Sequence, residues 1–243
     1  EVDDIRATGS HTPPTAWTSD AEPFFPFVDT FGQYKHKDWP GKVHSLAEIQ
    51  QRRTQEAKEL AAQPGPKDWD KYGGWATSPQ LPATGFFRTE KLSGKWWLVD
   101  PDGNFFIHKG VTSVAPQDSP KSNAAFKSQF GNEKKWANDT ATLLKSYGFN
   151  GTAAWTNDAV LRKSASPLAY APLWSFMSTY GKKRGGTYQE PGHTGYPLDC
   201  IFVFDPEFET FCDEHAKQLA ATKDDPNLLG HFFDNELPLP ATA

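Results

Sequence analysis

The 243-residue sequence lacks the markers of several large protein classes. Its two cysteines, Cys200 and Cys212, are too few for a disulfide scaffold, and neither has the neighbours of a zinc site or a catalytic thiolate. The sequence is compatible both with a single disulfide bridge between them and with two reduced thiols. No apolar run approaches the roughly 18–20 residues of a membrane-spanning helix. The formal net charge of −5 offers no basic surface for nucleic acid. We therefore expect no membrane or nucleic-acid partner, no metal and no other cofactor.

A secretory leader is also absent from the printed sequence. The first residues, EVDDIRATGSHTPPTAW, are acidic and polar, whereas a leader has a basic start and an apolar segment. We expect a secreted or periplasmic protein whose leader has been removed.

Aromatic residues, by contrast, are abundant: nine Trp, 18 Phe and seven Tyr make up 14% of the sequence. Most of them are expected in the core, because aromatic rings bury large areas. A surplus at a surface cleft is also a means of holding sugars, since a ring stacks on the apolar face of a pyranose. Composition alone leaves both roles open for any single ring.

The pattern along the chain predicts two regions. Residues 1–84 are rich in Pro, Trp and Gly, and we expect them to form an N-terminal extension that packs on a larger domain. One helix is expected inside it, from a capping box at Ser45 and Glu48 to the helix-ending Pro64-Gly65. Residues 85–243 are expected to form the first half of that larger domain.

This second region starts with three strand-like runs separated by turn signals at Ser93-Gly94 and Asp102-Gly103. The third run, 104–111, is apolar at its centre and is expected to be one buried strand. Further strands are expected in FNGTAAW (149–155), PLAYAPL (167–173) and LLGHFF (228–233). Helices are expected between them, near 132–147, near 158–163, and from Asp205 onward, with a long loop over 174–204.

Alternation of strands and helices predicts a parallel sheet with helices outside it, in an α/β fold. A doubly wound sheet would show a G-x-G-x-x-G loop after its first strand, and none follows 104–111. A (β/α)8 TIM barrel places its chemistry at the carboxyl ends of its strands. Those ends carry polar and aromatic groups here: Thr112, Ser113, Trp155, Asn157, Trp174 and 234–236. We therefore expect an N-terminal extension followed by about the first four β/α units of such a barrel.

An Asn-Glu pair, Asn235-Glu236, follows the fourth strand and resembles the catalytic pair of the clan A retaining glycoside hydrolases. The stretches GKWWLVDPDGNFFIHKGVTSV, VFDPEF and GHFFDNELP resemble the family 50 members, the β-agarases, and the similarity covers most of residues 27–240. The resemblance implies retaining hydrolysis of a β-linked galactan, an agarose-like polysaccharide or oligosaccharide. It also implies that Glu236 is the general acid/base and that Asn235 hydrogen-bonds the sugar 2-hydroxyl.

In the clan, the nucleophilic Glu comes from the seventh strand, and no second Glu in this sequence follows an expected strand. We therefore expect that the chain is the N-terminal half of the barrel, that the nucleophile lies outside it, and that residues 1–243 alone are poorly folded and inactive. The alternatives are a β-galactosidase or other β-glycanase of the clan, or a non-catalytic carbohydrate-binding protein.

Further substrate-binding candidates lie at strand ends and in the long loop. Trp155 and Trp174 are the expected stacking residues. His193 and Tyr196 in the loop, and His108 in the first strand, are candidates for hydrogen bonds to sugar, although a structural role also accounts for each. The loop residues 182–184, Lys-Lys-Arg, fit either anionic groups of a polysaccharide or a solvated turn.

Overall fold

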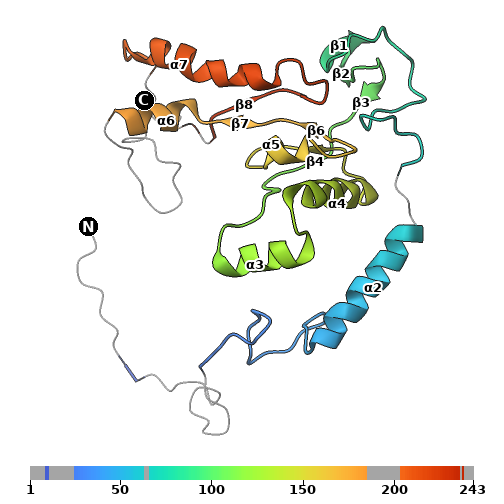
Figure 1. Cartoon of the computed structure of the whole chain (residues 1–243), viewed down its shortest axis with the longest axis vertical. Coiled ribbons are helices and arrows are strands. Elements are labelled where there is room, and N and C mark those ends of the chain that lie inside the picture. The colour runs from blue at the N-terminus through green and yellow to red at the C-terminus, as the bar shows by residue number, and fades with distance from the viewer. Residues whose placement is uncertain (1–8, 11–24, 63–65, 185–202, 236, 238–243) are drawn as a thin grey trace. The chain divides into compact units, whose positions relative to one another are not determined.

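A computed structural model describes residues 9–10, 25–62, 66–184, 203–235 and 237 (Figure 1). The chain divides into two compact units, 1–62 and 63–243. Among the described residues, every helix is too short or too polar to cross a bilayer.

The first unit ends in the long helix α2 (Leu46–Ala62), which starts at the expected capping box. Ser45 Oγ accepts a hydrogen bond from the Glu48 N–H at 3.2 Å, and the Glu48 carboxylate accepts one from the His44 N–H at 2.9 Å. The first bond satisfies an N–H group that a helix start leaves without a partner, and the second ties the residue before the cap to the first turn of the helix. Ahead of the helix, Lys42 Nζ donates to three backbone carbonyls, those of Tyr34, Lys35 and Lys37. No residue of α2 is buried.

The second unit opens with an antiparallel sheet in the order β1 (Arg88–Leu92), β2 (Lys95–Val99), β3 (Phe105–Phe106). Both turns form where the sequence predicted them. Ser93 and Gly94 have φ values of 49° and 79°, as a two-residue hairpin requires. At the second turn, Asp100 Oδ1 accepts hydrogen bonds from the N–H groups of Asp102, Gly103 and Asn104.

A loop over residues 68–76 packs on this sheet through a pair of carboxyl groups. Trp75 pairs with Phe105 of β3, and Asn104 Nδ2 donates to Asp70 Oδ2 at 2.7 Å. Asp100 is fully buried, and its Oδ2 receives no N–H donor from the described residues. Its polar neighbour is the carboxyl group of Asp70, which is within hydrogen-bonding reach of Asp100. Two carboxyl groups this close are stable only when they share a proton.

Asp100→Asn is therefore expected to remove a pH dependence of stability. Burial and the hydrogen bond to Asp70 raise the pKa of Asp100 to about 7, so the folded state holds a proton that the unfolded state releases near pH 4. The free energy of unfolding should then fall as pH rises from 5 to 7. The amide supplies the shared hydrogen at every pH, so the variant should lose this decline, a change of about 2 kcal/mol. Urea unfolding at pH 5 and pH 8 measures it.

The control for that experiment is Asp102→Asn, which breaks the ion pair between Asp102 and Lys71 but leaves the carboxyl pair intact. An Asp100→Asn variant that keeps the wild-type decline would show that no proton is shared between Asp70 and Asp100.

Four parallel runs follow, in sequence order. The strand β4 (Gly110–Val111) pairs with β5 (Gly151–Thr152), and β5 pairs with β6 (Ala169–Tyr170). A bridge between Tyr170 and Leu228 then leads to the pair β7 (Leu173–Trp174) and β8 (Phe232–Phe233). The expected parallel sheet is therefore confirmed in an α/β fold. Among the described residues it does not close into a barrel.

The helices lie between these runs: α3 (Pro120–Gln129), α4 (Glu133–Ser146), α5 (Asp158–Leu161), α6 (Phe176–Lys183), α7 (Phe208–Ala216) and the 3-10 helix η2 (Lys217–Thr222). Trp136, Ala137 and Leu161 form a core between α4 and α5, and Phe126 of α3 packs against it. Asn132 caps α4 as expected: its side chain accepts from the Lys135 N–H at 2.9 Å.

Three predictions about elements are wrong. The run 104–111 is not one strand, because Phe105–Phe106 pairs antiparallel with β2 whereas Gly110–Val111 pairs parallel with β5. The stretch expected to be a loop from Trp174 onward starts with the last residue of β7 and contains α6, whereas Leu173 of β7 lies in the predicted strand 167–173. The last helix starts at Phe208, and Asp205 precedes it in a turn, where Asp205 Oδ1 accepts from the Glu207 N–H. The sequence analysis also missed α3.

Candidate functional site

The carboxyl ends of the parallel strands carry strained backbone. Among the described residues, four that are not glycine have positive φ, and three of these follow parallel strands: Ser113 (59°), Trp155 (60°) and Asp234 (60°). A left-handed conformation is unfavourable for most residues with a side chain; Asp adopts it more readily, whereas a bulky residue such as Trp rarely does. Such strain collects where a structure holds a group in a particular direction for function. This strand edge is therefore the candidate site.

Asp234 joins the edge to a helix. Its Oδ1 accepts a hydrogen bond from the Met177 N–H at 2.8 Å, at the first turn of α6. The N-cap residue of α6, Ser175, makes no side-chain capping bond, so Asp234 supplies the cap from 57 residues away. Burial raises the pKa of Asp234 above its usual range, and the backbone N–H donors oppose the shift. Asp234 thus anchors the backbone from which Asn235 and Glu236 continue.

Replacing Asp234 by Ala is expected to lower the free energy of unfolding by about 1–2 kcal/mol, because the first N–H groups of α6 lose their acceptor. Asp234→Asn should cost less, since the amide oxygen still accepts and Asn tolerates positive φ. Urea unfolding of both variants measures the difference. Asp118→Ala removes an exposed carboxylate and is the control. Equal losses for the Ala and Asn variants would contradict the capping role.

Asn235 is half-buried directly after Asp234. Glu236 lies outside the described residues, as do His193 and Tyr196, so their roles stay predictions. We expect Glu236, Asn235 and at least one of Trp155 and Trp174 to line one cleft, and this too stays a prediction.

Trp174 lies at the end of β7, where the sequence placed it, and has a partner that the sequence analysis missed. Its indole Nε1 donates to His231 Nδ1 at 2.8 Å, between two parallel neighbours. Burial lowers the pKa of His231, which keeps the ring neutral and Nδ1 able to accept. His231 and Phe233 are two residues apart on the same run, and their ring centroids lie 6.3 Å apart. The orientation of Trp174 is therefore fixed by the neighbouring strand.

Trp155 is 56% exposed and follows β5. An exposed Trp in a strained backbone conformation suits a stacking platform better than a core residue. In the same segment, the Thr152 hydroxyl donates to Asp158 Oδ1 at 3.0 Å, and both residues are buried. Burial raises the pKa of Asp158 to about 6. From the sequence, Asp158 is expected only near the start of a short helix.

His108 lies between β3 and β4, not within a strand. Its ring stacks on Phe106 with centroids 6.1 Å apart, and the backbones of Gly110 and Gly151 press against it. A Cβ added at Gly151 would lie 2.1 Å from His108 Nε2. Burial lowers the pKa of His108, so the ring is neutral near pH 7. The ring lies ahead of the carboxyl end of β4, away from Thr112 and Ser113.

The basic residues 182–184 belong to the end of α6 rather than to a loop. Arg184 forms an ion pair with Asp205 at 3.1 Å, and Lys183 Nζ lies over the rings of Tyr180 and Phe211. These two cations therefore have partners within the chain. Among the described residues, no group of three His, Cys, Asp or Glu side chains is arranged to hold a metal ion.

Two kinds of comparison relate the chain to agarases, while no family model matches it. It is 25% identical over 288 residues to Beta-agarase B of Vibrio sp. (strain JT0107), covering 90% of this chain and 29% of that protein. An agarase, AgWH50C, matches at 23% identity with a TM-score of 0.63, over 87% of this chain and 38% of that one. An exo-beta-agarase matches at 23% identity with a TM-score of 0.63, over 94% of this chain and 41% of that one. The chain thus spans less than half the length of these relatives; it is similar to a beta-agarase in sequence and to agarases in fold.

Proposed function

We propose that this chain is part of a retaining glycoside hydrolase that cleaves a β-linked galactan of the agarose type, outside the cytoplasm. The observation that carries the proposal is the similarity to Beta-agarase B across 90% of the chain. The parallel runs support it, because they end at one edge where Asp234 anchors the chain just before Asn235-Glu236.

In this proposal Glu236 protonates the leaving glycosidic oxygen and then activates the attacking water. Asn235 donates a hydrogen bond to the sugar 2-hydroxyl, an interaction that strengthens as positive charge develops on the ring. Trp155 and Trp174 stack on neighbouring sugars. A retaining enzyme needs a second carboxylate about 5–5.5 Å from the first. No glutamate other than Glu236 follows an expected strand in the sequence, so in this proposal the nucleophile comes from a segment beyond it.

The test is hydrolysis by the protein as its full gene encodes it. We expect soluble oligosaccharides to be released from agarose and not from cellulose or xylan, and proton NMR should show the β-anomer as the first product. Binding of agarose without hydrolysis would replace the proposal by a non-catalytic carbohydrate-binding role. An α-anomer as the first product would contradict retention.

A further inference from the structure

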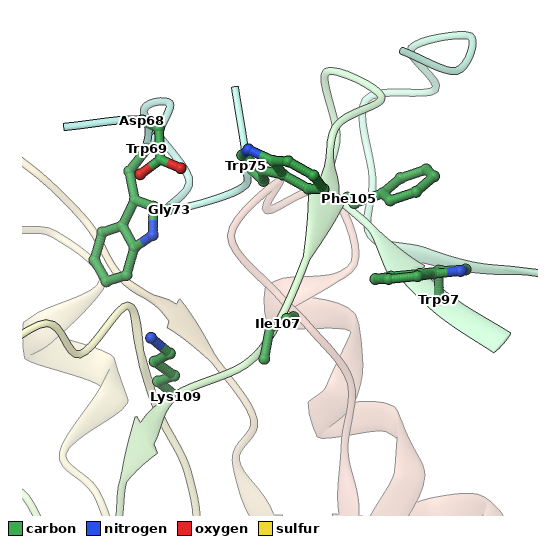
Figure 2. A pocket seen from close by; sticks show the side chains of 8 residues that line it. All are labelled: Asp68, Trp69, Gly73, Trp75, Trp97, Phe105, Ile107 and Lys109. Atoms are coloured by element: carbon green, nitrogen blue, oxygen red, sulfur yellow. The ribbon is translucent and has the colours of Figure 1, made fainter. Parts of the chain in front are cut away.

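A small hollow in the second unit has the composition of a sugar-binding site. It measures about 150 Å³ and is lined by three tryptophans together with apolar and charged groups (Figure 2): Asp68, Trp69, Gly73, Trp75, Trp97, Phe105, Ile107 and Lys109. Pockets for drug-sized ligands measure about 300–1,000 Å³. The hollow is therefore sized for a single ring.

The hollow lies away from the candidate catalytic edge. Lys109 directly precedes β4, whereas Thr112 and Ser113 follow that strand at its other end. Its other walls come from the antiparallel sheet, from Ile107 just after β3, and from the loop 68–76, and none of these segments contains a catalytic candidate. A ligand in the hollow would not contact Asn235 or the strained residues of the edge.

The rings are presented for stacking. Figure 2 shows Trp69 on one side of the hollow and Trp75 on the other, with Lys109 extending toward Trp69. Trp75 is 45% exposed, and Lys109 Nζ lies 5.9 Å from the centre of the Trp69 ring. Two aromatic walls beside an ammonium and a carboxylate, that of Asp68, match the apolar faces and hydroxyl rim of a pyranose.

The walls are also held in place before any ligand binds. Asp70 Oδ1 accepts from the N–H groups of Tyr72 and Gly74, both at 2.8 Å, which closes the loop between Trp69 and Trp75. The Trp75 N–H donates to the Phe105 carbonyl at 2.7 Å. On the far side, Trp97 stacks on Phe105 with centroids 4.7 Å apart. A rigid wall loses little freedom on binding, which favours even a small ligand.

We propose that this hollow binds one sugar unit of the polysaccharide as a secondary, non-catalytic site. The identity of the sugar, a galactan unit, rests on the proposed function. A second contact on the same polymer raises the effective concentration of chain segments at the catalytic edge. The hollow should therefore strengthen the binding of long substrates and not that of short ones.

The experiment compares Trp75→Ala with Trp96→Ala in the full-length protein. Trp96 is also on the antiparallel sheet and is 69% exposed, but it does not line the hollow. Affinity electrophoresis through agarose should show at least about fivefold weaker retention for Trp75→Ala than for Trp96→Ala. The turnover of a short agarose oligosaccharide should stay within about twofold of wild type for both variants. Lys109→Met, an exposed change that keeps the alkyl stem, should also weaken retention.

Equal retention of the Trp75, Lys109 and Trp96 variants would overturn the proposal. A second outcome would also overturn it. If Trp75→Ala lowers the melting temperature and the turnover of the short substrate, while Lys109→Met is retained like wild type, the residues of the hollow serve packing and not sugar binding. The two proposals fail separately. If the wild-type protein binds agarose through Trp75 but does not cleave it, the proposed secondary site stands and the proposed hydrolase activity is refuted.

Discussion

Glu236→Gln in the full-length protein is expected to lower kcat on agarose by at least about a hundredfold while substrate binding is largely kept. The amide has nearly the shape of the carboxyl group but no proton to deliver to the leaving oxygen. Hydrolysis of a glycosidic bond between two sugars depends on that proton, because a sugar alkoxide is a poor leaving group. Initial rates of reducing-sugar release measure kcat, and retention in agarose gels reports binding.

An aryl glycoside with a good leaving group separates this role from a structural one. Its bond breaks with little protonation, so Glu236→Gln should slow the first step on that substrate much less than on agarose. Glu209→Gln, an exposed residue of α7, is the matched control and should leave both rates unchanged. Near-normal turnover of agarose by Glu236→Gln would remove Glu236 from the mechanism.

Local signals in the sequence predicted the elements whose causes are local. The turn at Ser93-Gly94 needs only two residues that accept positive φ, and the helix α4 needs only Asn132 and an apolar face. The order of the parallel runs followed from their alternation with helices. The polar residues Asp234 and Asn235 were expected after the last strand, which is where they lie.

Partners distant in sequence explain what was missed. The helix α6 has no capping side chain of its own, and its acceptor is Asp234, 57 residues further along. The run 104–111 contains apolar residues throughout its centre, and its division into β3 and β4 depends on separate partners, Val99 and Gly151. The hydrogen bond from Trp174 to His231 likewise requires the register of β7 against β8. None of these pairings has a signal within one element.

A single buried side chain, Asn150, joins three of these distant segments. It is 2% exposed and lies directly before β5. Its Oδ1 accepts from the Lys109 N–H at 2.7 Å. Its Nδ2 donates to the carbonyls of Gly73 and Ile107, both at 3.0 Å. Asn150 therefore connects the loop 68–76, the segment between β3 and β4, and the start of β5.

Asn150→Ala is accordingly expected to lower the free energy of unfolding by about 3–5 kcal/mol, because a part-buried backbone N–H and two carbonyls lose their partner at once. Asn150→Asp keeps the shape and the acceptor but turns the two donor contacts into contacts between a carboxylate and carbonyls, so it should be similarly destabilising and worse as pH rises above 5. Asn123→Ala, which removes an exposed hydrogen bond to Asp118, should change stability by less than about 0.5 kcal/mol. Urea unfolding of the three variants measures these differences. If Asn150→Ala loses as little stability as Asn123→Ala, then water replaces the Asn150 side chain and other contacts hold the three segments together.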